Sequence, residues 1–229
     1  MKNYHRGLVS AYTVGMVLFF SIALVLVVIY SNIGFQVNIT QKKVVEKAVD
    51  QVDDHFVVAG KISASADVSS NDLIATATPV KTVSDGPIHV DSKRMTVSYE
   101  LVQLENYTIN YENIYGGSIP DKSYNSLRDA VADAKNRGII SVNPFVDEQK
   151  PDITTAFVYW IVNQNFDNFV DNDELAVFAI VYADRDRPSS GEQLFIQVNV
   201  PEGYVLRIEQ DVPNISGDVL NFGGIVGGS

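Results

Sequence analysis

The feature that most constrains this chain is a long uncharged segment near its N-terminus. The polar leader Met1–Gly7 carries Lys2 and Arg6, and no charged residue then follows until Lys42. Within this segment, Leu8–Ile33 is apolar and longer than the ~20 residues that an α-helix needs to cross a bilayer. Because positive charge before the first apolar span favours keeping that end in the cytoplasm, we expect the rest of the chain to lie outside.

The leader differs from a conventional secretory signal. Such a signal has an apolar core of ~7–15 residues with its cleavage site after the core. Here the apolar span is longer, and the junction best suited to cleavage, Arg6-Gly7-Leu8, precedes it. Cleavage after Gly7 would remove both positive charges and leave the apolar helix as the new N-terminus. The alternative is a signal anchor that stays uncut in the membrane.

The helix is predicted to continue beyond the apolar span. Segment 42–56 has apolar residues at helical spacing, with charges between them: Val45, Ala48, Val49 and Val52. A helix from about Ser10 to Asp53 would be on the order of 65 Å long at 1.5 Å per residue. Since the hydrocarbon core of a bilayer is only ~30 Å thick, the C-terminal part of the helix must rest against protein or stand in water.

After Val57 the apolar pattern changes from helical to alternating. Turn-forming clusters such as Asp85-Gly86-Pro87, Gly116-Gly117 and Pro201-Glu202-Gly203 separate short segments rich in Val, Thr, Ile and Tyr. We predict strands at 61–66, 73–78, 94–100, 107–113, 154–162, 175–183, 193–200 and 204–209. Short strands with turn signals at roughly ten-residue spacing are typical of a β-sandwich.

One insert departs from the strand pattern. Residues 126–138 begin with Ser126 and Asp129 as a capping box and end at Gly138, so we predict a short helix there. The predicted fold class is therefore α+β. Its parts are a leader at 1–7, a long N-terminal hydrophobic α-helix at 8–55, and an immunoglobulin-like antiparallel β-sandwich at 56–229.

Composition excludes several classes of function. The 229-residue chain has no cysteine, which excludes disulfide and thiolate chemistry. A net charge of −11 disfavours nucleic acid as a partner, because phosphates need a basic face. The three histidines, His5, His55 and His89, lie in no context that suggests a nucleophile or a zinc site. We therefore expect no enzymatic activity and no required cofactor.

Several segments carry a family resemblance. The leader ending at Gly7 precedes a long uncharged helix, and 50–58 (DQVDDHFVV) leads from that helix into the first strand. Segment 162–165 (VNQN) runs into 171–174 (DNDE), and 195–198 (FIQV) leads through Pro201-x-Gly203 into 205–209 (VLRIE). In these features the chain resembles the archaellins, the filament subunits of the archaeal motility organelle. The resemblance covers both ends of the chain and is thin between residues 73 and 151.

The resemblance implies a function and a set of partners. A prepilin-type peptidase would cut between Gly7 and Leu8, after Arg6, and the transiently membrane-inserted helix would then leave the lipid. The chain would polymerise with identical or paralogous subunits on the archaellum membrane platform, giving an extracellular filament for swimming at the cell surface. The alternative is a membrane-anchored extracellular β-sandwich protein, such as an archaellum accessory protein, an adhesive pilin or a surface binding module.

Three N-glycosylation sequons occur, at Asn38, Asn106 and Asn214. Asn106 and Asn214 fall in predicted exposed strand or turn regions. Asn38 falls on the long helix, where a glycan would obstruct bundle packing unless it faced outward. Asn106 and Asn214 are therefore the better candidates, and Asn38 is the least favoured. Archaellins are often N-glycosylated, so the resemblance favours glycosylation at these sequons.

The acidic stretch 165–174 (NFDNFVDNDE) is a candidate cation site. Clustered carboxylate and amide oxygens are the ligands that Ca²⁺ and similar divalent cations prefer, which points to Asp167, Asp171 and Asp173. The stretch lacks the fixed spacing and the central glycine of an EF-hand loop. We favour the simpler interpretation, a solvated turn in which Asp and Asn are present for their turn geometry.

Overall fold

The computed structural model describes residues 56–223, apart from 84–85, 91–92, 105–106 and 202. The larger of its two main sheets contains β1 (Phe56–Val58), β2 (Ile62–Asp67), β3 (Asp72–Thr82), β7 (Tyr115–Ser123), β8 (Thr155–Val162), β10 (Leu175–Val181) and β13 (Val219–Phe222). The smaller contains β5 (Thr96–Val102), β6 (Thr108–Tyr111), β11 (Gln193–Asn199) and β12 (Val205–Asp211). A two-stranded pair, β4 (Ile88–His89) and β9 (Phe169–Val170), accompanies them.

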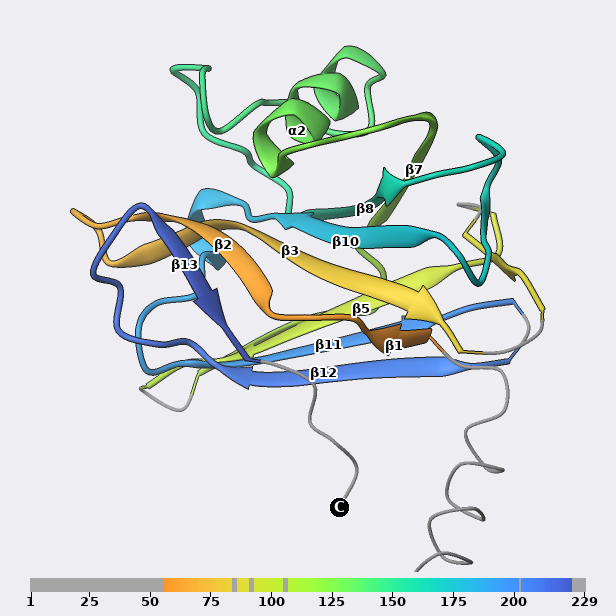
Figure 1. Cartoon of the computed structure of the whole chain (residues 1–229). Helices are drawn as coiled ribbons and strands as arrows, with labels where there is room; N and C mark the ends of the chain where they lie inside the picture. Colours follow the sequence, from red (N-terminus) through yellow and green to blue (C-terminus); the bar gives the residue numbers. More distant parts are fainter. Residues whose placement is uncertain (1–55, 84–85, 91–92, 105–106, 202, 224–229) are drawn as a thin grey trace, which may run out of the picture. The chain divides into compact units, whose positions relative to one another are not determined.

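The two main sheets face each other, and one helix, α2 (Leu127–Asn136), covers the outer side of the larger sheet (Figure 1). The larger sheet runs β13-β2-β3-β10-β8-β7, with β1 also paired to β3. The smaller sheet runs β12-β11-β5-β6. The domain is thus a β-sandwich with a third, helical layer on one face.

The main apolar core lies between the two sheets. Along β5 and β11 every second residue is buried, as in Tyr99 and Ile196, because successive side chains of a strand point to opposite faces. Trp160 of β8 and Tyr182, just after β10, are fully buried in the same core. The inner face of the smaller sheet therefore packs against the larger sheet, while its outer face is available to solvent.

Strands β8 and β10 are buried on both faces. Their alternate residues belong to two different clusters, so that Trp160 faces the smaller sheet while Phe157 and Tyr159 face helix α2. The helix contributes its small side chains to this second cluster, notably Ala130 and Ala134. Double burial explains why both strands are nearly continuous apolar runs in the sequence rather than alternating ones.

Helix α2 forms part of a crossover connection. Strand β7 pairs with β8 in parallel, with Ser118 opposite Val158, and parallel neighbours need a long connection rather than a hairpin. Residues 124–154, which include α2, supply that connection. The other strand pairs are antiparallel. The expectation of a wholly antiparallel sandwich is therefore wrong at this one pairing.

The predicted boundaries of α2 are confirmed by its caps. The Ser126 hydroxyl accepts a hydrogen bond from the Asp129 N–H at 3.1 Å and donates to the Asp129 carboxylate at 2.8 Å. This is half of a capping box, because the carboxylate bonds to the serine hydroxyl instead of to its backbone N–H. Gly138 has φ +73° and donates its N–H to the Lys135 carbonyl at 2.9 Å, as a C-terminal glycine does.

All eight strands expected from the alternating pattern are present, as β2, β3, β5, β6, β8, β10, β11 and β12. Strands β1, β4, β7, β9 and β13 were not predicted. The expected turn at Gly116-Gly117 is wrong, because both glycines lie within β7. A Cβ on Gly116 would come within 2.8 Å of Thr155 Cγ2, and Gly117 has φ +142°. These glycines therefore serve close strand packing rather than a turn.

The predicted N-terminal helix at 8–55 and the leader at 1–7 lie outside the described residues. Within the part of the chain that the structure does describe, no helix is both long and apolar enough to cross a membrane.

The tight packing of α2 predicts a specific sensitivity to side-chain size. Ala130→Leu would force three extra carbon atoms between the helix and the sheet, so we expect a loss of about 1–3 kcal/mol in the free energy of unfolding. Ala132→Leu is the matched control, since Ala132 is only half-buried and lies outside that cluster. Urea unfolding of both variants measures the difference, and equal stabilities would contradict this packing.

Candidate functional site

The acidic loop, residues 163–174, lies between β8 and β10 and is anchored by a buried glutamate. Glu174 is only 3% exposed. Its Oε2 accepts from Trp160 Nε1 at 3.2 Å and from the Asp171 N–H at 3.3 Å, while its Oε1 accepts from the Gln164 N–H at 2.7 Å. One carboxylate thus ties both ends of the loop to the core tryptophan. A buried charge is tolerated when its oxygens are hydrogen-bonded in this way.

A second buried side chain, Asn163, shapes the tip of the acidic loop. Its Nδ2 donates to the Pro120 carbonyl of β7 at 2.8 Å, and its Oδ1 accepts from the Phe166 N–H at 2.7 Å. Phe166 has φ +58°, a left-handed conformation that is unfavourable for a bulky side chain. The same residue is 53% exposed. The loop therefore holds an aromatic ring in solvent on a strained backbone.

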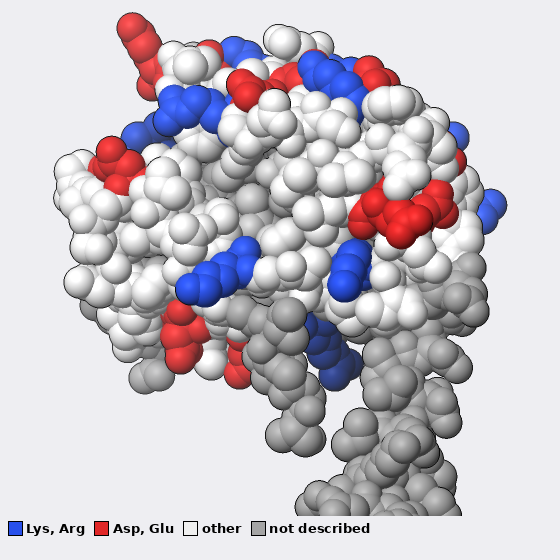
Figure 2. All heavy atoms as spheres, in the orientation of Figure 1, with Lys and Arg blue, Asp and Glu red and all other residues white. Residues whose placement is uncertain are grey.

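The three predicted cation ligands do not converge. Asp167 Oδ1 accepts from the Phe169 N–H at 2.8 Å, and Asp171 Oδ2 accepts from Asn165 Nδ2 at 2.8 Å. Asp171 and Asp173 line a hollow of about 510 Å³ beside Gly86, whereas Asp167 does not. Figure 2 shows acidic side chains gathered on the side of the domain where this loop lies.

The bonds made by Asp167 and Asp171 are those of a hydrogen-bonded turn. Among the described residues, no three acidic or histidine side chains are grouped so as to hold a metal ion. These bonds agree with the turn interpretation, and the cation site stays a prediction.

A second hollow, of about 450 Å³, was not predicted from the sequence. We call it the Arg185 hollow; its lining includes Tyr111, Tyr115, Gly116, Ile139, Ile153, Thr154, Thr155, Arg185 and Asp186. These residues come from β6, β7, the crossover, β8 and the turn after β10. No local motif marks such a hollow, because only the tertiary fold brings its five segments together.

The floor of the Arg185 hollow is a buried carboxylate. Asp186 accepts from the Tyr111 hydroxyl at 3.1 Å and from the Thr154 hydroxyl at 2.8 Å. Burial and the bond to this carboxylate raise the pKa of Tyr111, so its hydroxyl stays protonated as a donor. Arg185 Nε lies 3.5 Å from Asp186 Oδ1, and its side chain is 74% exposed. The hollow thus combines a buried, hydrogen-bonded carboxylate on its floor with an exposed guanidinium at its edge.

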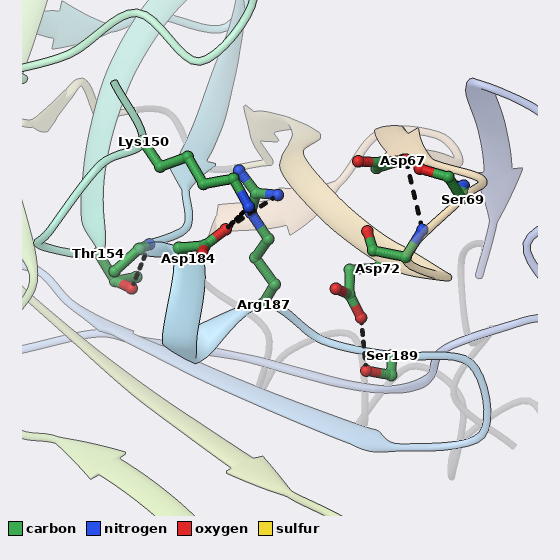
Figure 3. A network of polar contacts seen from close by, with 10 residues as sticks. Asp67, Ser69, Asp72, Lys150, Thr154, Asp184, Arg187 and Ser189 are labelled. Carbon is green, nitrogen blue, oxygen red and sulfur yellow. Dashed lines mark hydrogen bonds and ion pairs between the residues drawn. The ribbon is translucent and has the colours of Figure 1, made fainter. Parts of the chain in front are cut away.

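A polar network fixes the segments beside this hollow. Figure 3 shows Lys150 and Arg187 pointing at Asp184, with Lys150 Nζ at 2.7 Å and Arg187 Nη1 at 3.3 Å from its Oδ1. In the same view, Ser189 donates to the Asp72 carboxylate at 2.7 Å. These bonds tie the end of the crossover and strand β3 to the connection between β10 and β11. Such a fixed frame is what a contact surface requires.

Of the three sequons, the structure describes only Asn214. It is exposed in the connection between β12 and β13, next to the buried Ile215. An acceptor on an ordered but exposed loop is accessible to a glycosyl transfer enzyme. Asn38, Asn106 and the leader junction Arg6-Gly7-Leu8 lie outside the described residues.

Comparison with known proteins identifies the fold. No protein-family model and no curated protein matches the sequence. The structure is similar to the crystal structure of archaeal flagellin FlaB1 from Methanocaldococcus jannaschii, with a TM-score of 0.52 at 11% identity over 73% of this chain and 96% of that one. This likeness shows an archaellin-like β-sandwich.

Two weaker likenesses accompany it. The archaeal flagellum of Methanospirillum hungatei strain JF1 gives a TM-score of 0.40 at 12% identity, over 94% of this chain and 98% of that one. The archaellum periplasmic stator protein FlaG from Sulfolobus acidocaldarius gives 0.34 at 10% identity, over 69% and 99%.

The anchor of the acidic loop can be tested by a change of one atom. Glu174→Gln replaces one acceptor oxygen with an NH₂ group that faces backbone or indole donors. We expect a loss of about 2–3 kcal/mol in the free energy of unfolding, because hydrogen bonds to a buried charge are lost and a donor is left unsatisfied. Asp173→Asn, at an exposed position of the same loop, should change stability by less than about 0.5 kcal/mol. Denaturant unfolding of both variants measures this, and a neutral Glu174→Gln would contradict the anchoring role.

Proposed function

We propose that this chain is a structural subunit that polymerises through its N-terminal helix into an archaellum filament for swimming. The observation that carries the proposal is the archaellin-like fold of residues 56–223. The long uncharged segment that precedes this domain, behind a short basic leader, supports it. The domain would then form the outer layer of an extracellular filament.

Leader cleavage would act as the switch from membrane protein to polymer. A helix that is apolar on every face must be buried, and a bundle of identical helices can replace lipid in this respect. The uncut leader would oppose the transfer, because Lys2 and Arg6 would have to enter an apolar core. A prepilin-type peptidase cutting after Gly7 would remove this barrier. Assembly on the archaellum membrane platform would follow.

The outer face of the smaller sheet suits a solvent-facing layer. Its side chains are mostly polar and bond to one another, as in Gln193 Nε2 to Glu209 at 3.2 Å and Asn199 Nδ2 to Thr96 at 3.1 Å. Strand β12 ends this sheet, and Arg207 and Glu209 are exposed on it. Charged side chains on an edge strand discourage uncontrolled strand addition. Such a face favours a soluble outer surface over a buried contact.

The alternative function is a membrane-anchored extracellular protein, for example an archaellum accessory protein. The length of the apolar span favours it, since Leu8–Ile33 alone would cross a bilayer. The two functions predict different N-termini, because only the filament subunit would be cut between Gly7 and Leu8. N-terminal sequencing of the purified protein would give Leu8 for the filament subunit and Met1 for the anchored protein.

A change at the cleavage junction tests the filament proposal. Gly7→Trp should leave the chain uncut, membrane-bound and unassembled, because the peptidase would no longer accept the junction. Asn3→Gln is the control, since it changes the leader without touching Gly7 and should leave assembly intact. Membrane fractionation and electron microscopy of both variants provide the measurement, and normal filaments from Gly7→Trp would overturn the proposal.

A glycan at Asn214 would add mass to the outer domain. We expect the native protein to show this mass, and both Asn214→Gln and Ser216→Ala to lose it, because each destroys the sequon. Ser216→Thr keeps the sequon and is the matched control. Mass spectrometry of the intact protein decides the point, and a bare Asn214 in the native protein would contradict it.

A further inference from the structure

The tip of the acidic loop projects an aromatic side chain at one end of β8. We call residues 165–167 the Phe166 knob. Phe166 is exposed and is held at φ +58° by the bond from its N–H to the buried Asn163. Backbone strain of this kind persists only where the surrounding structure enforces it, and it concentrates at functional sites. The acidic loop contains four acidic residues and no lysine or arginine.

The Arg185 hollow lies at the other end of the same strand. It is lined at the start of β8 by Thr155, whereas the knob follows the end of β8 at Val162. Ile139 and Ile153 give it apolar walls, and Ile153 is 69% exposed. Its volume, about 450 Å³, lies within the roughly 300–1,000 Å³ of sites that take small organic groups.

The two features are complementary in shape and charge. An exposed aromatic ring matches a hollow with isoleucine and tyrosine walls, where it would lose contact with water. The carboxylates of Asp167, Asp171 and Asp173, which are at least partly exposed, match Arg185, whose side chain is available to solvent. The Asp186 carboxylate on the floor is only 3% exposed, whereas the Arg185 side chain is 74% exposed, so an approaching carboxylate meets the guanidinium rather than Asp186.

We infer that the Phe166 knob of one subunit seats in the Arg185 hollow of a second copy of this chain. The contact joins opposite ends of β8, so it is heterologous: each copy offers a knob to one neighbour and a hollow to another. Contacts of this kind propagate into open assemblies unless the rotation closes a ring. The inference rests on the proposed function as a filament subunit and specifies which surfaces of its outer domains meet.

The absence of cysteine allows a direct test by disulfide trapping. Asn165→Cys and Asp152→Cys together place one thiol in the knob and one next to Ile153 in the full-length protein, and both positions are exposed. Mild oxidation of assembled material should give a reducible ladder of dimers, trimers and larger species. The two thiols cannot meet within one chain, because β8 spans on the order of 25 Å while a disulfide joins Cα atoms within about 7 Å.

Matched variants identify the side chain that makes the contact. Adding Phe166→Ala to the two-cysteine protein should reduce the ladder at least tenfold. Adding Phe169→Ala should not, although Phe169 is also an exposed aromatic residue of the acidic loop, stacked on His89 at 4.6 Å. Thermal unfolding of all variants provides the folding control. Equal ladders from both alanine variants would overturn the role of Phe166.

Other outcomes separate this inference from the proposed function. Normal filaments without a ladder would overturn the knob contact and leave the filament proposal intact. Absence of any polymer from the unmodified protein would overturn both. Dimers from Asn165→Cys alone would indicate a symmetric knob-to-knob contact, and linkage to a different protein would identify another occupant of the hollow; either would overturn the inference.

Discussion

The described domain depends on the burial of strands β8 and β10 on both of their faces. One set of their side chains closes the core against the smaller sheet, and the other set closes the layer beneath α2. Neither strand has a solvated face along its buried stretch, so neither can shift register without exposing apolar residues or burying polar ones. This constraint makes the two strands the fixed frame from which the loops at their ends are held.

The parallel pairing of β7 with β8 brings the cover for the outer faces of β8 and β10. Because β7 and β8 run in the same direction, a hairpin cannot join them. Residues 124–154 therefore cross over the sheet and place α2 on an apolar face that would otherwise be exposed. The crossover ends beside Asp186 and leaves the Arg185 hollow there, while the far end of β8 continues into the acidic loop. Two surface features with different chemistry therefore lie at opposite ends of one rigid strand.

The limits of sequence-based prediction have specific physical causes. Strands with one solvated face, such as β5 and β11, show the alternation from which they were predicted. Strand β7 was not predicted because Gly116 and Gly117 are typical of turns. Gly116 is required by the close approach of Thr155, which arises only in the folded structure. Glu174 was grouped with the surface carboxylates, yet it is a buried acceptor for Trp160, and that partner lies fourteen positions earlier on a separate strand.

Charge explains why a local contact such as the Phe166 knob would matter in a polymer of this chain. The net charge is −11, and loss of Lys2 and Arg6 would make it −11 − 2 = −13, so identical subunits repel one another. At physiological ionic strength this repulsion is screened beyond about 8 Å, whereas groups in contact interact across shorter distances. A neighbouring domain would therefore be positioned where its acidic loop meets an exposed cation beside apolar walls. The Arg185 hollow supplies that cation and those walls.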